Sequence, residues 1–159
     1  MILAACTGSP PLVGPTDPNG AVPAAPTRTS EAPATATPAP EFRSSTESAT
    51  AAPEGAVIVE LAGPPGHFEP RMVTAKAGDV IFYLANTSPG DHSMAIDRVA
   101  ITFNGDRVAN VPLVVSNVVQ RQTSAIFAVD GLPAGTYFFW CTVDSHAAEG
   151  MTGSLIVTP

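Results

Sequence analysis

The feature of this sequence that most constrains its fold is a pair of apolar runs near the C-terminus, joined by a short polar loop. The first run, Tyr137–Trp140, is aromatic and ends directly at Cys141, and the second run is Leu155–Val157. Short apolar runs bounded by Gly and Thr are typical of β-strands. The loop contains His146 and is closed by Met151. A thiol, an imidazole and a thioether are therefore confined to one loop between two expected strands.

Similar strand-like runs occur throughout residues 55–159. They are rich in β-branched and aromatic residues, and turn sequences with Gly, Pro or Asn separate them. We expect strands at 56–61, 72–76, 80–85, 92–96, 100–103, 108–115, 123–129, 137–140 and 154–158. Short strands at this spacing predict an all-β sandwich or barrel with little helix. Residues 97–122 are the least regular part, where Pro112 indicates an edge strand, a long loop or a small helix.

Residues 7–54 differ from the rest in composition. Ten of the 17 prolines precede residue 55, and Ala, Thr, Ser and Gly make up most of the remainder. Such a segment cannot bury enough apolar surface to offset the entropy cost of ordering it. We therefore expect a disordered linker at 7–54, followed by one folded domain at 55–159. Extended proline-rich chain spans up to ~3.1 Å per residue, so the linker could hold the domain on the order of 100 Å from an anchor.

Residues 1–6 carry a second motif. Leu3-Ala-Ala-Cys6 resembles the lipobox of bacterial lipoproteins, in which the Cys becomes a lipidated N-terminus after signal cleavage. Because only Met1 and Ile2 precede this motif, we expect the rest of a signal segment to lie upstream. The alternatives are a chance occurrence in an Ala-rich chain, or a disulfide between Cys6 and Cys141. The resemblance implies lipid anchoring at Cys6 and an extracytoplasmic location, at the outer face of the cell membrane or in the periplasm.

Charge and hydropathy exclude several classes of partner. The formal net charge is -7, and residues 55–159 contain five basic and nine acidic side chains. This balance gives no basic patch for nucleic acid, although it is compatible with a cationic protein partner. No run in the body of the chain approaches the ~20 apolar residues of a membrane-spanning helix. Contact with a membrane would therefore depend on the anchor at Cys6.

The loop ligands need one more imidazole to complete a known kind of metal site. His92 stands at the end of another strand-like run and can supply it, if that strand ends at the same pole of the sandwich. Two imidazoles and a thiolate, with a weak axial thioether, form the ligand set of a blue copper electron-transfer centre. We therefore expect one copper ion, cycling between Cu(I) and Cu(II), at His92, Cys141, His146 and Met151.

Each candidate ligand also has an ordinary structural interpretation. Cys141 could be a small buried hydrophobic residue, and Met151 could fill a gap in the core. His92 could be a residue of a surface turn. Two neighbouring side chains are left out of the site: Met94 is interpreted as core, and His67 lies in a turn where we expect it to be solvated.

The motif Cys141-x4-His146-x4-Met151 resembles that of the small blue copper proteins, the cupredoxins. Its spacing is similar to that of auracyanins and close to that of azurin and plastocyanin. Residues 68–82 are similar to the opening strands of such domains, and residues 86–92 to the segment that leads into the first ligand. The resemblance spans about residues 55–159 and implies a Greek-key β-sandwich.

Two positions depart from the pattern of the family. Asp144-Ser145 stand where relatives often have Pro-Gly, which could alter the rigidity of the loop. Ser93 stands after the first His, where relatives often have an Asn whose hydrogen bonds help to fix the site. We hypothesise that Ser93 donates a hydrogen bond near the sulfur of Cys141 and so influences the reduction potential.

The resemblance implies a one-electron carrier and not an enzyme. Such a protein would act as a monomer and dock to a redox donor and a redox acceptor through the exposed edge of a ligating His. Two alternatives use the same sequence features: a copper-binding or copper-delivery protein, and a metal-free interaction module. A multicopper oxidase would need further His-rich motifs, whereas this chain has 3 His. A binuclear copper site would need a second Cys in the loop.

Overall fold

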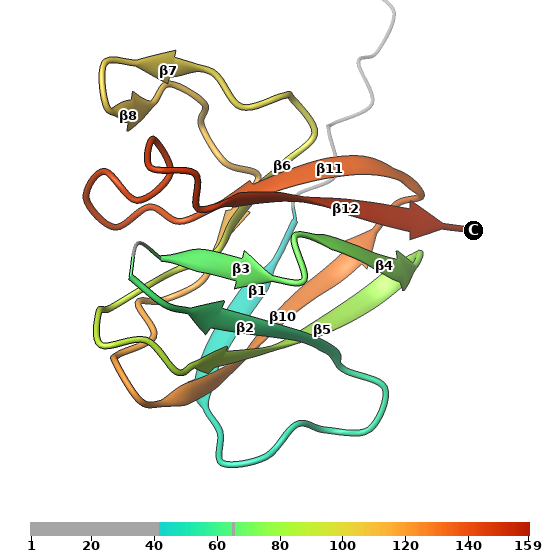
Figure 1. Ribbon diagram of the computed structural model, residues 1–159. Coiled ribbons are helices and arrows are strands. Elements are labelled where there is room, and N and C mark those ends of the chain that lie inside the picture. Colours follow the sequence, from blue (N-terminus) through green and yellow to red (C-terminus); the bar gives the residue numbers. More distant parts are fainter. Residues whose placement is uncertain (1–41, 65) are drawn as a thin grey trace, which may run out of the picture. The chain divides into compact units, whose positions relative to one another are not determined.

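The structure is a computed structural model that describes residues 42–64 and 66–159 (Figure 1). One set of strands comprises β1 (Ser44–Ser48), β2 (Val57–Ala62), β3 (His67–Glu69), β5 (Gly78–Asn86) and β10 (Ser124–Leu132). A second set comprises β4 (Met72–Lys76), β6 (Ala95–Asp97), β9 (Val114–Val115), β11 (Gly135–Trp140) and β12 (Thr152–Thr158). A small hairpin pairs β7 (Phe103–Asn104) with β8 (Arg107–Val108).

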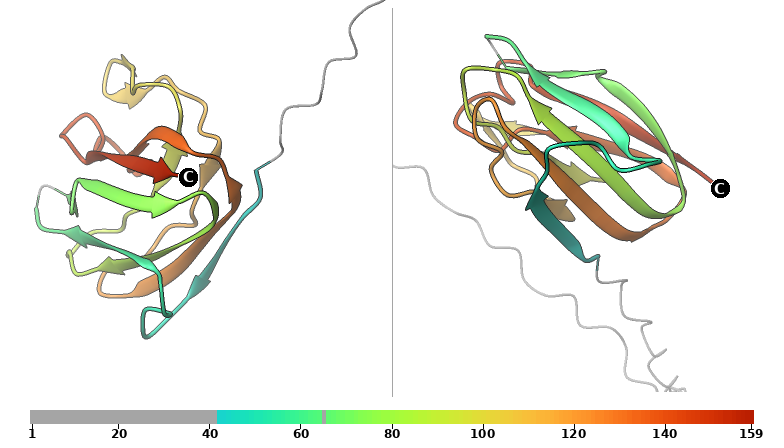
Figure 2. Two further views of the ribbon diagram at one scale, coloured as in Figure 1. Left: turned by 90° about the vertical axis from the view of Figure 1, so that its right-hand side faces the viewer. Right: turned by 90° about the horizontal axis from the view of Figure 1, so that it is seen from below.

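The strands form two facing sheets (Figure 2). The first has the order β1-β10-β5-β2-β3 and the second the order β4-β12-β11-β6-β9. The pairs β2–β5 and β4–β12 are parallel, and the other pairs in these sheets are antiparallel. The described residues form strands, turns and loops without a helix, so none of them forms a helix that could cross a membrane. The predicted all-β sandwich is confirmed.

Alternating side chains explain why the two sheets stack. In β5, Val80, Phe82 and Leu84 are buried, and in the paired strand β10 Phe127 and Val129 are buried as well. The rings of Phe82 and Phe127 stack with their centroids 5.9 Å apart. This period of two places one apolar face of each strand in the core and leaves the other face toward solvent.

Aromatic contacts also join the two sheets. Phe68 of β3 meets Phe139 of β11 edge to face, with ring centroids 5.0 Å apart. Both rings are completely buried, as is Met94, which the sequence analysis interpreted as core. The hydroxyl of Tyr137 donates a hydrogen bond to the carbonyl of Pro133 at 2.7 Å, which fixes the turn into β11. Packing of this kind sets where β11 ends and therefore where Cys141 lies.

The folded part begins earlier in the chain than predicted. Residues 44–48 were expected to belong to the linker, yet they form β1, an edge strand in which Ser44 pairs with Val129 of β10. Phe42 lies against the guanidinium of Arg98, whose carbon is 5.8 Å from the ring centroid. The composition of this segment concealed the strand, because its side chains are Ser, Thr and Glu and the stabilising contacts are made by the backbone. Residues 1–41, with Cys6 and most of the predicted linker, lie outside the described residues.

Residues 97–122 contain two short strand pairings and no helix. The β7–β8 hairpin is joined to the body by Asn110, whose side-chain amide donates to the carboxylate of Asp97 at 3.1 Å. β9 pairs with β6 at the edge of the second sheet. Asp97 is buried and also accepts the backbone N–H of Arg98 at 2.7 Å. These hydrogen bonds, which no hydrophobic periodicity signals, hold the long connection in place.

Three connections meet at one end of the sandwich, on the left in Figure 1. They are the turn between β2 and β3, the segment from β5 to β6, and the loop from β11 to β12. The segment between β5 and β6 is tied to the connection between β9 and β10, since His92 and Val119 form an isolated antiparallel bridge. This end of the sandwich contains the candidate metal ligands.

Candidate metal centre

Cys141 is delivered by β11. Its side chain is 1% exposed, and its backbone N–H donates to the carbonyl of Met151 at 3.1 Å. The strand places Phe139 in the main core, whereas the following Trp140 packs with Ala95 and Ala147 in a separate apolar cluster. Both faces of the strand are thus anchored, so the thiol has a defined position when the strand ends.

The loop after Cys141 is held by its own hydrogen bonds. The N–H of His146 donates to the carbonyl of Val143 at 3.2 Å, and the N–H of Met151 donates to the carbonyl of His146 at 2.8 Å. The hydroxyl of Ser145 donates to the carboxylate of Glu149. Asp144 adopts a positive φ of 44°, a conformation that Asp tolerates better than most residues. These bonds constrain the loop even though the Pro-Gly sequence of relatives is absent.

His92 reaches the same place from the segment before β6. Its side chain is 2% exposed, and its Nε2 lies 2.7 Å from the hydroxyl of Ser88. That hydroxyl is within hydrogen-bond distance of the side-chain oxygen of Asn86, 2.8 Å away, while the amide nitrogen of Asn86 donates to the carbonyl of Val119. If Nε2 carries the proton and donates it to Ser88, Nδ1 presents its lone pair to the centre of the site.

The three donor atoms converge. Nδ1 of His92 is 3.2 Å from Nδ1 of His146, and the sulfur of Cys141 is 3.8 Å and 3.6 Å from these two nitrogens. With metal–nitrogen bonds of about 2.0 Å and a metal–sulfur bond of about 2.3 Å, as in zinc sites, a trigonal plane requires nitrogen–sulfur distances of about 3.7 Å and a nitrogen–nitrogen distance of about 3.5 Å. The observed triangle therefore fits one ion at its centre.

Met151 is completely buried and borders the His92 ring. A β-carbon built on Gly66 would lie 2.8 Å from Sδ of Met151 and 2.5 Å from Cε1 of His92. Because both atoms are so close to one point, the thioether and the imidazole are neighbours. The thioether therefore lies at the border of the His2Cys triangle, where a weak additional ligand is expected.

The sulfur of Cys141 receives hydrogen bonds from the backbone. The N–H groups of Ser93 and Val143 both lie 3.5 Å from it. The hydroxyl of Ser93 is 3.9 Å from the sulfur and 2.7 Å from the hydroxyl of Thr142, and it accepts the N–H of Thr142 at 2.9 Å. Ser93 thus cross-links the two ligand-bearing segments, and its hydroxyl lies at the outer limit of a contact with sulfur. Its effect on the potential stays a prediction.

Burial shifts the proton affinities of two of these groups in the metal-free protein. Desolvation raises the pKa of the Cys141 thiol above its ordinary value of 9.0, against the backbone donors of Ser93 and Val143, which lower it. Desolvation also lowers the pKa of His92 below 6.5; the neighbouring His146 lowers it further, whereas Asp91 opposes the shift. In the metal-free protein near pH 7, Cys141 is therefore a thiol and His92 an uncharged imidazole.

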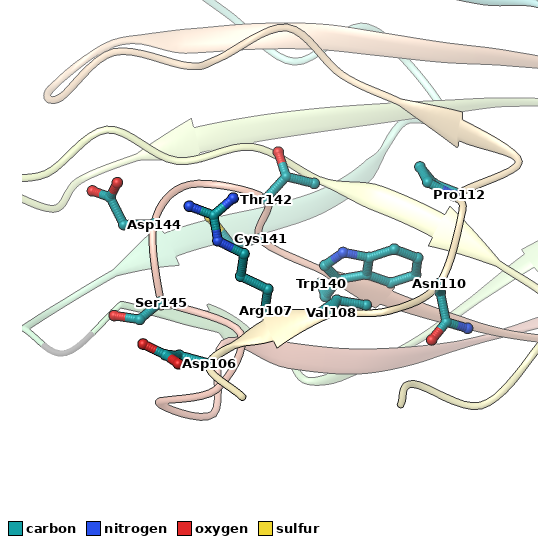
Figure 3. A pocket seen from close by; sticks show the side chains of 10 residues that line it. All are labelled: Asp106, Arg107, Val108, Asn110, Pro112, Trp140, Cys141, Thr142, Asp144 and Ser145. Atoms are coloured by element: carbon teal, nitrogen blue, oxygen red, sulfur yellow. The ribbon is translucent and has the colours of Figure 1, made fainter. Parts of the chain in front are cut away.

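The ligands differ in how they meet solvent. His92, Cys141 and Met151 are buried, whereas the side chain of His146 is half-buried. A separate open pocket of about 560 Å³ lies between the β7–β8 hairpin and the loop that follows Cys141 (Figure 3). It is lined by Arg107, Trp140, Thr142 and Asp144, among others. His146 is therefore the ligand through which another molecule can approach the site most directly.

The structure brings His92, Cys141, His146 and Met151 together, as the sequence analysis expected of ligands. Cys141 is a free thiol, and Cys6 lies outside the described residues. His67 is half-buried at the start of β3 rather than fully solvated. Sequence reasoning missed Ser88 and Gly66. The only signal for Ser88 was its position four residues before His92, and Gly66 looked like an ordinary turn residue.

Comparison with curated proteins finds a similar sequence among the plastocyanins. A plastocyanin from Nostoc punctiforme (strain ATCC 29133 / PCC 73102) is 32% identical over 93 residues, which cover 57% of this chain and 63% of the plastocyanin. The match thus spans less than two thirds of that relative. No family model matches the sequence.

Solved structures with the same fold include two auracyanins and an amicyanin. Auracyanin B superposes with a TM-score of 0.53 at 18% identity, covering 73% of this chain and 98% of auracyanin B. The reduced auracyanin of Roseiflexus castenholzii has a TM-score of 0.52 at 20% identity, covering 66% of this chain and 100% of that auracyanin. A reduced amicyanin variant gives 0.51 at 17% identity over 74% of this chain and 99% of its own.

The donor set decides which metal fits. A buried thiolate and two imidazoles in a triangle, bordered by a thioether, suit copper in both of its common oxidation states. The carboxylates that calcium or magnesium would require are missing from the described cluster. The site therefore takes one copper ion. Taken together, the two-sheet fold, the His2Cys cluster with its adjacent methionine and the plastocyanin similarity show that this chain has the fold of the auracyanins and amicyanin and resembles the small blue copper proteins in its ligand set.

Proposed function

We propose that this protein is a one-electron carrier that binds copper through His92, Cys141, His146 and Met151. The observation that carries the proposal is the triangle of 3.2, 3.6 and 3.8 Å among the three donor atoms. Bound copper would supply a one-electron couple. The chain's own residues supply the rest: a thiolate and two imidazoles held at fixed separations, buried away from water.

Rigidity of the ligands favours electron transfer over metal delivery. The N–H of Cys141 is bonded to the carbonyl of Met151, and the N–H of Met151 to the carbonyl of His146, so three of the ligands belong to one hydrogen-bonded loop. Ser88 fixes the ring of His92 from outside. A site that changes little between oxidation states avoids the cost of rearranging its ligands, whereas a delivery protein must release its metal readily.

His146 provides the route for electrons and the point of contact with partners. It is the one half-buried residue among the four, and its ring centroid is 4.9 Å from that of the buried His92. A redox donor protein and an acceptor protein would dock in turn over this edge, to a monomer of the carrier. The proposed role is electron transfer and not an enzymatic reaction.

The test is an absorption spectrum and a voltammogram of the copper-loaded protein, with Cys141→Ser as the control. An electron carrier gives an intense visible charge-transfer band that is lost in Cys141→Ser, together with reversible one-electron oxidation. A colourless site that binds only Cu(I) and exchanges it quickly would indicate copper delivery instead. Failure to bind copper at all would leave a metal-free interaction module.

We also propose that the domain is tethered to a membrane through a lipid on Cys6, at the outer face of the cell membrane or in the periplasm. The lipobox-like Leu3–Cys6 supports this. Phe42 lies beside Arg98, whose guanidinium also contacts Tyr137 near the start of β11, whereas Cys141 follows the end of that strand. A linker that joins the domain at Phe42, near the start of β11, leaves the end of the sandwich with the candidate metal ligands free for partners.

Mass spectrometry of the protein expressed behind a bacterial lipoprotein signal tests the tether. A diacylglyceryl mass on Cys6, lost in Cys6→Ala together with membrane association, is the expected result. Release of the unmodified protein into the soluble extracytoplasmic fraction would contradict lipid anchoring without affecting the copper proposal.

A further inference from the structure

Gly66 makes the closest approach of any described glycine to the metal ligands. It is buried in the turn between β2 and β3, and a β-carbon built on it would lie 2.5 Å from Cε1 and 3.2 Å from Nδ1 of His92. The same β-carbon would lie 2.8 Å from Sδ of Met151. Carbon contacts normally begin near 3.5 Å, so even one methyl group at this position collides with two ligands at once.

Backbone conformation does not explain this glycine. Gly66 is absent from the residues with positive φ, unlike Gly63 in the same turn, whose φ is 60°. Its backbone is therefore accessible to a residue with a side chain. What a side chain cannot share is the space, because the His92 ring and the Met151 thioether fill it.

The two ligands that border Gly66 differ in how far they can yield. His92 is fixed on its far side by the hydroxyl of Ser88, 2.7 Å from Nε2. Met151 has three rotatable side-chain bonds and is bound to the metal only weakly in sites of this kind. A methyl group on residue 66 would therefore move the thioether first, and the imidazole only if the thioether has no room.

We propose that Gly66 is a positioning residue for the copper site. Its missing side chain lets the backbone of Gly66 lie directly against His92 and Met151, which keeps the thioether beside the imidazole. This inference rests on the proposed ligand set but not on the role of the site in electron transfer. It also assigns the turn a function that its Gly-Pro-Pro-Gly sequence does not suggest.

The test compares Gly66→Ala with Gly90→Ala. Gly90 borders the same imidazole, but its added β-carbon would lie 3.8 Å from Nε2 of His92, an ordinary contact. We expect Gly66→Ala to lower copper affinity by about tenfold or more and to change the visible spectrum, as losses of supporting contacts around metal ligands do. Gly90→Ala should keep both properties of the parent protein.

A readout without metal separates this inference from the proposed function. In metal-free protein with 13C-labelled methionine methyl groups, Gly66→Ala should shift the signal of Met151 and leave that of the buried Met94 in place. An unshifted Met151 signal together with unchanged copper affinity would overturn the role of Gly66. If the parent protein itself does not bind copper, the proposed function fails, while the methyl shift still reports on Gly66.

A second background guards against misfolding of the variant. In Met151→Ala the thioether is absent, so adding Gly66→Ala should reduce copper affinity by a smaller factor than it does in the parent protein. Thermal unfolding of the metal-free variants shows whether each one is folded. An equal loss of affinity in both backgrounds would show that Gly66 does not act through Met151.

Discussion

The hydroxyl of Ser88 lies 2.7 Å from Nε2 of His92. It also lies 2.8 Å from the side-chain oxygen of Asn86, and it accepts the N–H of Gly90 at 3.2 Å. The buried imidazole is thus joined to a hydrogen-bonded turn rather than to solvent. When Nε2 donates to this hydroxyl, Nδ1 keeps its lone pair toward the other two donor atoms.

Ser88→Ala should therefore weaken copper binding. Without the hydroxyl, the N–H at Nε2 of His92 loses its partner, and the ring is free to rotate or to carry its proton on Nδ1. We expect a 10- to 100-fold loss of affinity, roughly the range for such supporting residues, measured by competition with a copper chelator. Ser45→Ala, on the exposed face of β1, is the matched control and should bind as the parent does. Equal affinities for both variants would contradict this role.

Ser93→Ala should lower the reduction potential by roughly tens of millivolts, as expected for loss of one weak hydrogen bond. A donor near the thiolate of Cys141 withdraws electron density and favours Cu(I), so its removal favours Cu(II). The Ser93 hydroxyl is 3.9 Å from the sulfur and within hydrogen-bond distance of the Thr142 hydroxyl. If Ser93 donates to the sulfur, it accepts from Thr142, so Thr142→Val should lower the reduction potential as well. Voltammetry measures both. Unchanged potential and copper affinity in Ser93→Ala would remove the hypothesis.

The metal-free protein should lose stability as the pH falls below about 6.5. Burial and the nearby His146 hold the pKa of His92 below its unfolded value, so the unfolded chain binds a proton there before the folded protein does. The stabilisation is present above the unfolded pKa and is lost as the pH falls toward the folded one. Chemical unfolding at several pH values tests this. His92→Gln should show a weaker pH dependence over the same range, and an equal dependence would assign the effect to other groups.

Binding of Cu(I) should release about one proton near pH 7, because the metal requires a thiolate. Burial raises the pKa of Cys141, so the free protein holds a thiol at this pH. Calorimetric titrations in buffers of different ionisation enthalpy give the number of protons released. Release of none would mean that the free protein already holds a thiolate and that the direction of the shift is wrong.

The segment 42–48 should contribute to the stability of the domain. Removing it eliminates the pairing of β1 with β10 and the contact of Phe42 with Arg98. We expect a chain of residues 49–159 to be less stable than a chain of residues 42–159 by about 2 kcal/mol or more. Denaturant titrations measure the difference. Equal stabilities would restore the boundary near residue 55 that composition predicted.

How far the sequence predicted this protein depends on the range of each interaction. The strands from β4 to β12 that have a clear apolar period were predicted close to their observed bounds, because alternation in a strand is a local property. β1 and β3 were missed, since β1 is polar and β3 has three residues. The β7–β8 connection was unclear, because a hydrogen bond from the half-buried Asn110 to the buried Asp97 holds it instead of apolar contacts.

The sequence by itself determined that Cys141, His146 and Met151 share one loop between two strands, because few residues separate them. Only the tertiary structure decided that His92 meets them, that Ser88 orients its ring and that Gly66 closes over it. Apart from the Ser88–His92 contact, which lies within one segment, those contacts join segments from both sheets and form only when the sheets stack. Their distances depend on the packing of the core, which no local pattern specifies.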